Sequence, residues 1–382
     1  MMEMEEAETI DLYELQYSDL SSPSTSSMVD SIMEALEPTV PGLLAVPIAS
    51  NLRSHLLSLS RKLALLDLDT RKLVLKEHNL GSDVPLRNPD RSVSPFAMQL
   101  KYAKSQHVQQ TVSECYGMEF ENLGRSFKEL GFCMMELGFC LARICDKAIG
   151  GNELEQSLLD SCAAKGRLIH HHSHLDALLL KQHERSRATS KRRGNNVKPL
   201  EGSESNSIAS NVNSGGNHLN LWQQWHYDYG IFTVLTTPLF ILPSYSETSK
   251  TEDTFSESCF GPSRKFYHSS WGSFARPCTL FIPSKFENLS RENFVVFLQP
   301  AWTKTFSISD YHHANSTFNG QLLVATDEEQ EQSERDSNNL SQEIKKIVPP
   351  LSSRLKEGMT FAEFSRETTK QFYGGSGLQS NR

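Results

Sequence analysis

One short segment restricts the possible folds of this chain more than any other. It reads Trp-His-Tyr-Asp-Tyr-Gly over residues 225–230 and continues as the apolar run Ile-Phe-Thr-Val-Leu over residues 231–235. β-Branched and aromatic residues in this density favour a strand over a helix. Because side chains alternate faces along a strand, His226 and Asp228 are expected to point the same way.

This pair has two interpretations. An imidazole and a carboxylate on one face of a strand supply two of the three ligands of a 2-His-1-carboxylate iron site. The alternative is an exposed polar pair at the start of a strand, since a bare His-x-Asp occurs often by chance. The rest of the chain has to decide between them.

The patterning elsewhere predicts an α+β fold. Apolar residues at helical spacing indicate a helix over 52–78 and a longer one that starts at 123 and ends at the glycines 150 and 151. We infer that Gly131 and Gly138 allow that helix to pack closely on a sheet. Strands are expected at 219–228, 230–242, 277–283 and 293–300, and a last helix at 358–372. Helices followed by short strands favour a β part built as a sandwich or jelly roll.

A run of histidines follows the long helix, in the sequence Arg-Leu-Ile-His-His-His-Ser-His over residues 167–174. Such a cluster suggests metal binding. On a strand, His170, His172 and His174 would share one face, but the outer two would be roughly 13 Å apart, too far to share one ion. We therefore favour a strand whose polar face lines a pocket.

Composition divides the chain into three regions. A mostly helical region is expected over 1–160, a β core over 161–320, and a polar linker with the final helix over 321–382. The core is interrupted by a Ser, Asn and Gly-rich insertion over 181–218, which is predicted to be disordered. It contains the basic run Lys191, Arg192 and Arg193, which is read as solvated linker in preference to a nuclear signal.

Charge and cysteine content exclude several classes of protein. A net charge of −8 argues against a nucleic-acid binder or a protein of anionic membrane surfaces. No apolar run is long enough to span a bilayer, and the first residues do not resemble a secretory signal. Seven cysteines without a Cys-x-x-Cys pair fit a reducing compartment. These features predict a cytoplasmic protein.

Taken in order, these elements resemble the isopenicillin N synthase-like Fe(II)/2-oxoglutarate-dependent dioxygenases. The resemblance rests on Gly-Phe-Cys-Leu-Ala-Arg-Ile-Cys at 138–145, Arg-Leu-Ile-His at 167–170, and His-x-Asp-x-Gly-x-x-Thr-x-Leu at 226–235. The amino-acid sequence of residues 75–92, 291–302 and 352–371 looks most like that of an uncharacterised plant branch of that superfamily.

The resemblance implies a double-stranded β-helix core that binds iron through His226 and Asp228 and uses 2-oxoglutarate as cosubstrate. It also implies that Arg291 meets the far carboxylate of 2-oxoglutarate. Asn293, which stands where the family has Ser, offers a hydrogen bond. The alternative for Arg291 is an ordinary arginine at the start of a strand.

The third iron ligand departs from the family pattern. Ala275 stands near the place of the family's distal histidine, and His268 is the only histidine in that interval, so His268 is the candidate third ligand. Residues 245–273 show little strand character, which predicts an incomplete β core and suggests a shortened form of the family's chain.

Two functions follow from the resemblance. The first is an oxygenase that hydroxylates or desaturates a small organic metabolite. The second is a catalytically inactive relative that acts as a binding or regulatory protein because the distal histidine ligand is missing.

Overall fold

The structure is a computed structural model of the chain, and it describes most of the expected helices and strands. The described residues are 12–21, 25–36, 43–47, 51–101, 119–194, 221–226, 228, 230–242, 253–255, 266–269, 278–281, 288–306 and 355–373.

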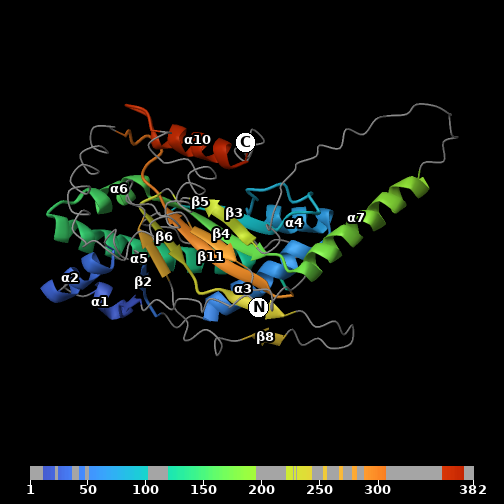
Figure 1. The fold of residues 1–382 in the computed structure, drawn as a ribbon, viewed down its shortest axis with the longest axis horizontal. Helices are drawn as coiled ribbons and strands as arrows, with labels where there is room; N and C mark the ends of the chain where they lie inside the picture. Colours follow the sequence, from blue (N-terminus) through green and yellow to red (C-terminus); the bar gives the residue numbers. More distant parts are fainter. Residues whose placement is uncertain are drawn as a thin grey trace, which may run out of the picture.

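Helices make up most of the described first half of the chain and surround a central sheet (Figure 1). They are α1 (Tyr17–Ser21), α2 (Ser26–Ala35), α3 (Asn51–Leu65), α4 (Leu68–Glu77), α5 (Leu123–Ile149), α6 (Glu153–Ser161) and α7 (His174–Gly194). Helix α10 (Phe361–Tyr373) lies close to the end of the chain.

The central sheet has nine strands, in the order β1-β2-β9-β6-β11-β4-β3, with β7 added to β11 and β8 to β7. These strands are β1 (Tyr13–Glu14), β2 (Leu43–Ala45), β3 (Val93–Lys101), β4 (Ala163–His171), β6 (Phe232–Leu235), β7 (Leu239–Leu242), β8 (Asp253–Phe255), β9 (Phe266–Ser269) and β11 (Ser290–Leu298). All their pairings are antiparallel except β1 with β2. A separate antiparallel pair joins β5 (Leu221–His226) to β10 (Cys278–Phe281). The predicted mixture of helices and an antiparallel β part is confirmed.

Helix α5 packs on this sheet through its glycines. A Cβ atom on Gly131 would lie 2.5 Å from Leu100 of β3, and one on Gly138 would lie 2.7 Å from Leu298 of β11. Side chains at these two positions would push the helix away from the strands, so the inferred reason for the glycines is confirmed. Gly150 ends the helix in the left-handed region, at φ 82°.

Three predicted elements have different boundaries in the structure. The helix expected over 52–78 is divided at Asp67, whose carboxylate accepts hydrogen bonds from the first amides of α4. The strand expected over 230–242 is divided into β6 and β7 by residues 236–238, which include a proline. The insertion expected from residue 181 begins later, because α7 continues to Gly194, and residues 195–220 lie outside the described residues.

The segment 245–273 also contains more strand than expected. Strands β8 and β9 both fall within it, and β9 pairs with β2 and with β6. The central sheet is therefore continued at a place where an interruption was predicted. The other residues of this segment lie outside the described part of the chain.

The paired strands β4 and β11 present two different faces, because directly opposite residues in an antiparallel pair share a face. On one face, Phe294 meets Phe127 of α5 edge to face, with ring centroids 4.8 Å apart. We call this the helix-covered face. The opposite face carries Arg291, Asn293 and His171, and continues onto Thr233 of β6. We call this the polar face.

Candidate functional site

The polar face contains a buried arginine. Arg291 is 9% exposed, and its Nη1 lies 3.2 Å from Nε2 of His171, its partner in the register of β11 and β4. A guanidinium nitrogen only donates, so Nε2 of this buried imidazole is the acceptor. The sequence placed Arg291 just ahead of the strand expected at 293–300, and in the structure it is the second residue of β11.

Buried polar atoms on this face lack a hydrogen-bond partner among the described residues. Oδ1 of Asn293 and Oγ1 of Thr233 are examples, and both side chains are buried. Buried polar atoms nearly always find a partner in the protein, in water or in a ligand. The polar face therefore offers hydrogen-bonding capacity that the described protein groups leave unused.

Of the two residues predicted to bind iron, His226 belongs to the smaller sheet and Asp228 lies just after it. His226 is the last residue of β5 and stands opposite Cys278 of β10, while Asp228 follows two residues later and is half-buried. The side chain of His226 lies outside the described part of the structure. The expected convergence of His226 and Asp228 stays a prediction.

The predicted third ligand belongs to the other sheet. His268 lies on β9, with its backbone opposite Thr233 of β6 and Leu43 of β2. Its side chain lies outside the described residues, as does Ala275. The role of His268 as an iron ligand stays a prediction.

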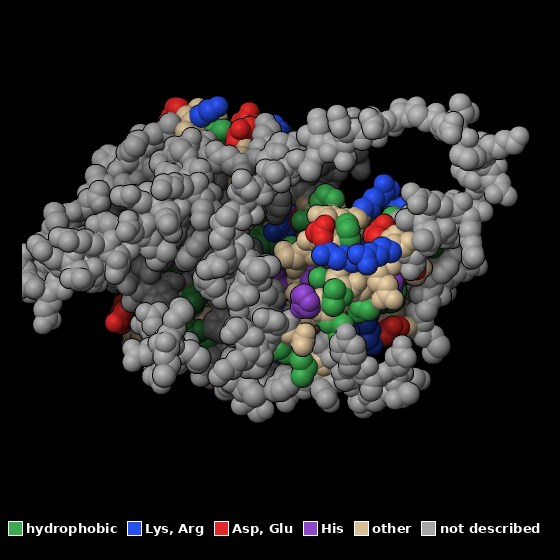
Figure 2. Space-filling view, turned by 45° about the vertical axis from the view of Figure 1, so that its right-hand side comes forward, with side chains coloured by type: hydrophobic (Ala, Val, Ile, Leu, Met, Phe, Trp, Pro, Cys, Tyr) green, Lys and Arg blue, Asp and Glu red, His purple; other side chains and the backbone are tan. Residues whose placement is uncertain are grey.

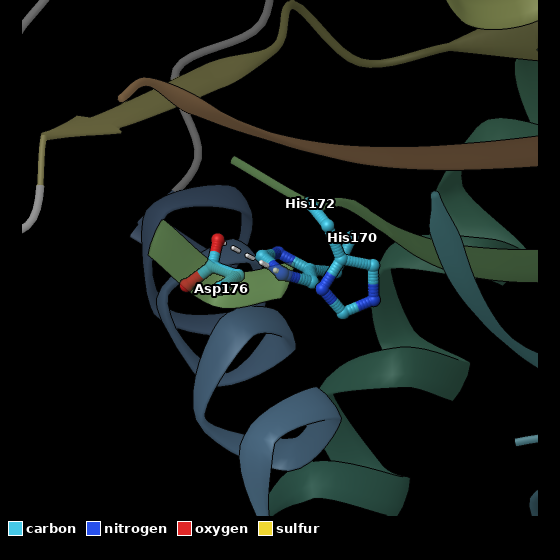
Figure 3. A group of neighbouring side chains, drawn as sticks. All are labelled: His170, His172 and Asp176. Carbon is cyan, nitrogen blue, oxygen red and sulfur yellow. Dashed lines mark ion pairs between the residues drawn. The ribbon is translucent and has the colours of Figure 1, made fainter. Parts of the chain in front are cut away.

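A second group of polar side chains lies at the end of the β4–β11 pair, on the helix-covered face. His170, His172 and Asp176 each offer one ligand atom, and these atoms lie within 4.8 Å of one another. Figure 3 shows the three side chains next to one another, with the ion pair of His170 and Asp176 as a dashed line. We call this group the histidine cluster. All three residues are at most 5% exposed.

The cluster forms because β4 ends sooner than predicted. Oγ of Ser173 accepts a hydrogen bond from the amide of Asp176, and the Asp176 carboxylate accepts one from the amide of Ser173. This reciprocal pair starts helix α7. The chain turns after His171, and the rings of His170 and His172 come to 4.3 Å between centroids.

The prediction that His170, His172 and His174 share one strand face is therefore wrong. His174 is instead the first residue of α7 and is exposed. The signal that could have revealed this is the sequence Ser-His-Leu-Asp at 173–176, because Ser-x-x-Asp is a capping-box pattern.

Two carboxylates surround His170. Its Nδ1 donates to Glu292, with N···O distances of 2.9 and 3.0 Å, and its Nε2 lies 3.5 Å from Oδ2 of Asp176. Burial by itself lowers the pKa of His170, but the two carboxylates outweigh it and raise the pKa to about 9. With a proton in place, the imidazolium of His170 forms a buried bridge between two anions.

Asp176 is held from a second side by Arg61 of α3, whose Nη2 lies 2.9 Å from Oδ1. Burial by itself would raise the pKa of the Asp176 carboxyl, but His170 and Arg61 hold it well below its usual range. Glu292 in turn accepts a hydrogen bond from Ser290, at 2.8 Å. The charges of Arg61, Asp176, His170 and Glu292 compensate one another.

His172 is the neutral member of the cluster. Its Nε2 lies 2.8 Å from Oγ of Ser94, which also accepts a hydrogen bond from Arg91. Burial, the nearby charge of His170 and the charge of Arg91 together hold the pKa of His172 far below its usual range. Nδ1 of His172 and Nε2 of His170 are both buried without a hydrogen-bond partner in the described chain.

The charges on the surface concern the expectation that the chain does not bind nucleic acid, and the length and hydropathy of the helices concern the expectation that it does not span a membrane. On the face shown in Figure 2, basic side chains of the described residues lie beside acidic ones. The prediction that the chain does not bind nucleic acid stays a prediction. Among the helices that the structure describes, none combines the length and the apolar character needed to cross a membrane.

Comparison with known proteins gives similarities in structure only. No protein-family model matches the chain, and no curated protein matches it. A full-length Neurospora crassa protein, solved in complex with alpha-KG, is 12% identical over 78% of this chain and 87% of its own, with a TM-score of 0.46. A dioxygenase for auxin oxidation in rice is 11% identical over 81% of this chain and 96% of its own, with a TM-score of 0.44.

A third similar structure is JOX2, solved in complex with 2OG, Fe and JA. It is 11% identical over 76% of this chain and 75% of its own, with a TM-score of 0.45. Identities and scores this low assign neither a family nor an activity to this chain.

Proposed function

We propose that the chain is an oxygenase of the Fe(II)/2-oxoglutarate-dependent type, similar to the isopenicillin N synthase-like enzymes, that acts on a small organic molecule. The observation that carries this proposal is the polar face of β11. There a buried guanidinium lies on the same face as a buried amide oxygen without a hydrogen-bond partner among the described residues.

Arg291 is suited to a carboxylate ligand. Its planar guanidinium can form two parallel hydrogen bonds to a carboxylate, and burial strengthens such a pair. In this proposal, Arg291 binds the far carboxylate of 2-oxoglutarate. The amide oxygen of Asn293 accepts a hydrogen bond from a donor on the ligand or from a bound water.

Fe(II) is assigned to His226 and Asp228, with His268 as the candidate third ligand. One imidazole and one carboxylate on neighbouring positions are the donor types that Fe(II) takes in such enzymes. When bound, the ion supplies the chemistry that couples oxidative decarboxylation of 2-oxoglutarate by dioxygen to hydroxylation or desaturation of the substrate. We further propose that the nine-stranded sheet and the β5–β10 pair are the two sheets of a double-stranded β-helix.

The histidine cluster does not fit this iron. An oxygenase metal keeps coordination positions open for the cosubstrate and dioxygen. His170, His172 and Asp176 are instead at most 5% exposed, and Arg61 and Ser173 already bind the carboxylate. The cluster is therefore not given a role in the oxygenase reaction.

The second candidate function is that of a binding or regulatory protein without catalytic activity, and the residue opposite His226 favours it. The residue opposite His226 in the register of β10 is Cys278, and the described residues of β10 include no histidine. A chain that binds 2-oxoglutarate and iron without turning over would be a binding or regulatory protein.

The test measures both properties on the full chain purified under nitrogen. Calorimetry with Fe(II) gives the affinity for 2-oxoglutarate, and succinate release in the presence of dioxygen gives turnover. Binding with Fe(II)-dependent succinate release supports the oxygenase. Binding without succinate release supports the binding protein. Failure to bind 2-oxoglutarate in the presence of Fe(II) would refute the assignment of Arg291 and both functions with it.

A further inference from the structure

The histidine cluster has two buried nitrogen atoms that the described protein groups leave without a hydrogen bond. They are Nδ1 of His172 and Nε2 of His170, the second of which lies 3.5 Å from Oδ2 of Asp176. Both residues belong to one group with the Asp176 carboxylate. A buried polar atom without a partner in a native protein points to a missing water, ion or ligand. Nδ1 of His172 is such an atom, and its position in one group with the imidazole of His170 and the carboxylate of Asp176 points to a cation.

The opposite nitrogen of each ring is held by a neighbouring side chain. Nδ1 of His170 donates to Glu292, and Nε2 of His172 lies 2.8 Å from Oγ of Ser94. Ser94 has two lone pairs, so it can accept from His172 as well as from Arg91. Metal-binding histidines almost always have their second nitrogen held in this way, which fixes the ring and its tautomer.

The spacing of the ligand atoms suits one small ion. Nε2 of His170 and Oδ2 of Asp176 are 3.5 Å apart, and all three ligand atoms lie within 4.8 Å of one another. Two atoms that each lie about 2.1 Å from a tetrahedral ion are about 3.4 Å apart. His170 and Asp176 already have this separation, and a pair at the 4.8 Å limit would have to close by about 1.4 Å to reach it.

We propose that His170, His172 and Asp176 bind one divalent transition-metal ion of the zinc class, in a buried site with a structural role. Two imidazoles and a carboxylate are ligands that Zn(II) accepts, and one water molecule would complete its tetrahedral coordination. The ion takes the place of the proton between His170 and Asp176.

This site would connect three elements behind the polar face. His170 lies near the end of β4, His172 directly follows that strand, Asp176 lies in the first turn of α7, and Arg61 links the same carboxylate to α3. The next residue along from His170 is His171, which contacts Arg291 on the other face. The inference stands without the proposed oxygenase function, because it uses residues of the opposite face only.

The experiment uses the full chain carrying His226→Ala and Asp228→Ala, so that the proposed iron ligands do not contribute. After removal of metal with a chelator, the protein is titrated with Co(II), followed by its visible absorption, and with Zn(II), followed by elemental analysis. We expect one ion per chain and the intense visible bands of low-coordinate Co(II). The same protein with His172→Asn should lose at least 100-fold in affinity, whereas His174→Ala, which changes an exposed histidine of the same run, should not change it.

Thermal unfolding provides a second measurement, in case His172→Asn folds poorly without metal. At a free Zn(II) concentration about 100 times the dissociation constant, the Tm of the protein with an intact cluster should rise by about 5 °C. The Tm of the His172→Asn protein should not respond. Absence of Co(II) and Zn(II) uptake by the intact cluster would overturn the proposal, and so would equal uptake by the His172→Asn protein.

Discussion

The two faces of the β4–β11 pair show how neighbouring residues acquire different tasks. On the helix-covered face, Glu292 and His170 are paired with each other and with further charges, so the group is electrically compensated. On the polar face, Arg291 and His171 are one residue away along the same strands, next to an amide oxygen that the described groups leave without a hydrogen bond. Compensation within the protein favours stability, whereas unused polar capacity favours binding. This contrast predicts that changes on the two faces affect different measurements.

The largest effect on stability is expected for Glu292→Ala. This change leaves the buried His170 with one carboxylate instead of two, and breaking a buried ion pair costs about 3–5 kcal/mol. The free energy of unfolding, measured by urea denaturation followed by circular dichroism, should fall by that amount. Glu292→Gln keeps a hydrogen-bond acceptor and should cost less. If Glu292→Ala unfolds at the wild-type urea concentration, the helix-covered face is not held by this pair.

Arg291→Leu should affect binding more than stability. Removing one partner of a buried charged hydrogen-bond pair costs at least about 2 kcal/mol, which is about 30-fold in affinity for 2-oxoglutarate. The free energy of unfolding should change by less than in Glu292→Ala. Calorimetry with 2-oxoglutarate and Fe(II) measures the first quantity, and urea denaturation the second.

Arg87→Leu is the matched control for this change, because it removes an exposed arginine. It should leave the affinity for 2-oxoglutarate unchanged. An equal loss of affinity in both variants would show that the effect comes from net charge and would remove the special role of the polar face.

Ser173→Ala tests the turn that separates the two faces. The hydroxyl of Ser173 caps α7 and donates to Asp176 at 2.8 Å, and loss of such a cap costs about 1 kcal/mol. The free energy of unfolding should fall by about that much, while affinity for 2-oxoglutarate stays the same. A change in affinity without a loss of stability would indicate that the turn positions His171 and Arg291 directly.

The smallest effect on the free energy of unfolding is expected at acidic pH for a change of Asp83, which pairs with Lys165 and Arg167 near the first residues of β4. Although burial raises the pKa of Asp83, Arg167 and Lys165 outweigh it and lower the pKa below its ordinary value. Their ion pairs with Asp83 therefore stabilise the fold above about pH 4, and this contribution is lost as the pH falls further. Urea denaturation at several pH values should show a shallower acid dependence for Asp83→Asn than for the wild type. Identical profiles would contradict the role of this pair.

Local elements could be predicted from the sequence because their signals are local. The apolar stripe of α5, its end at Gly150 and the close packing at Gly131 and Gly138 all follow from spacing along one helix. The strand that contains Arg291 was placed by its β-branched and aromatic residues. Most errors concern boundaries, where a single cap at Asp67 or Ser173 outweighs the hydrophobic pattern, and one concerns the segment 245–273, where β8 and β9 continue a sheet that was expected to be interrupted.

The sequence by itself determined the α+β character and several of the helices and strands, and it marked Arg291 as a candidate for binding. Only the tertiary structure decided which polar residues meet. His170 and Glu292 are 122 positions apart, and Arg61 and Asp176 are 115 apart, so no local pattern connects them. Their contact depends on the register of β4 with β11 and on the packing of α3 and α7. Burial then sets the strength of each charge interaction, because a charge that has lost its water depends on the partners that the fold brings to it.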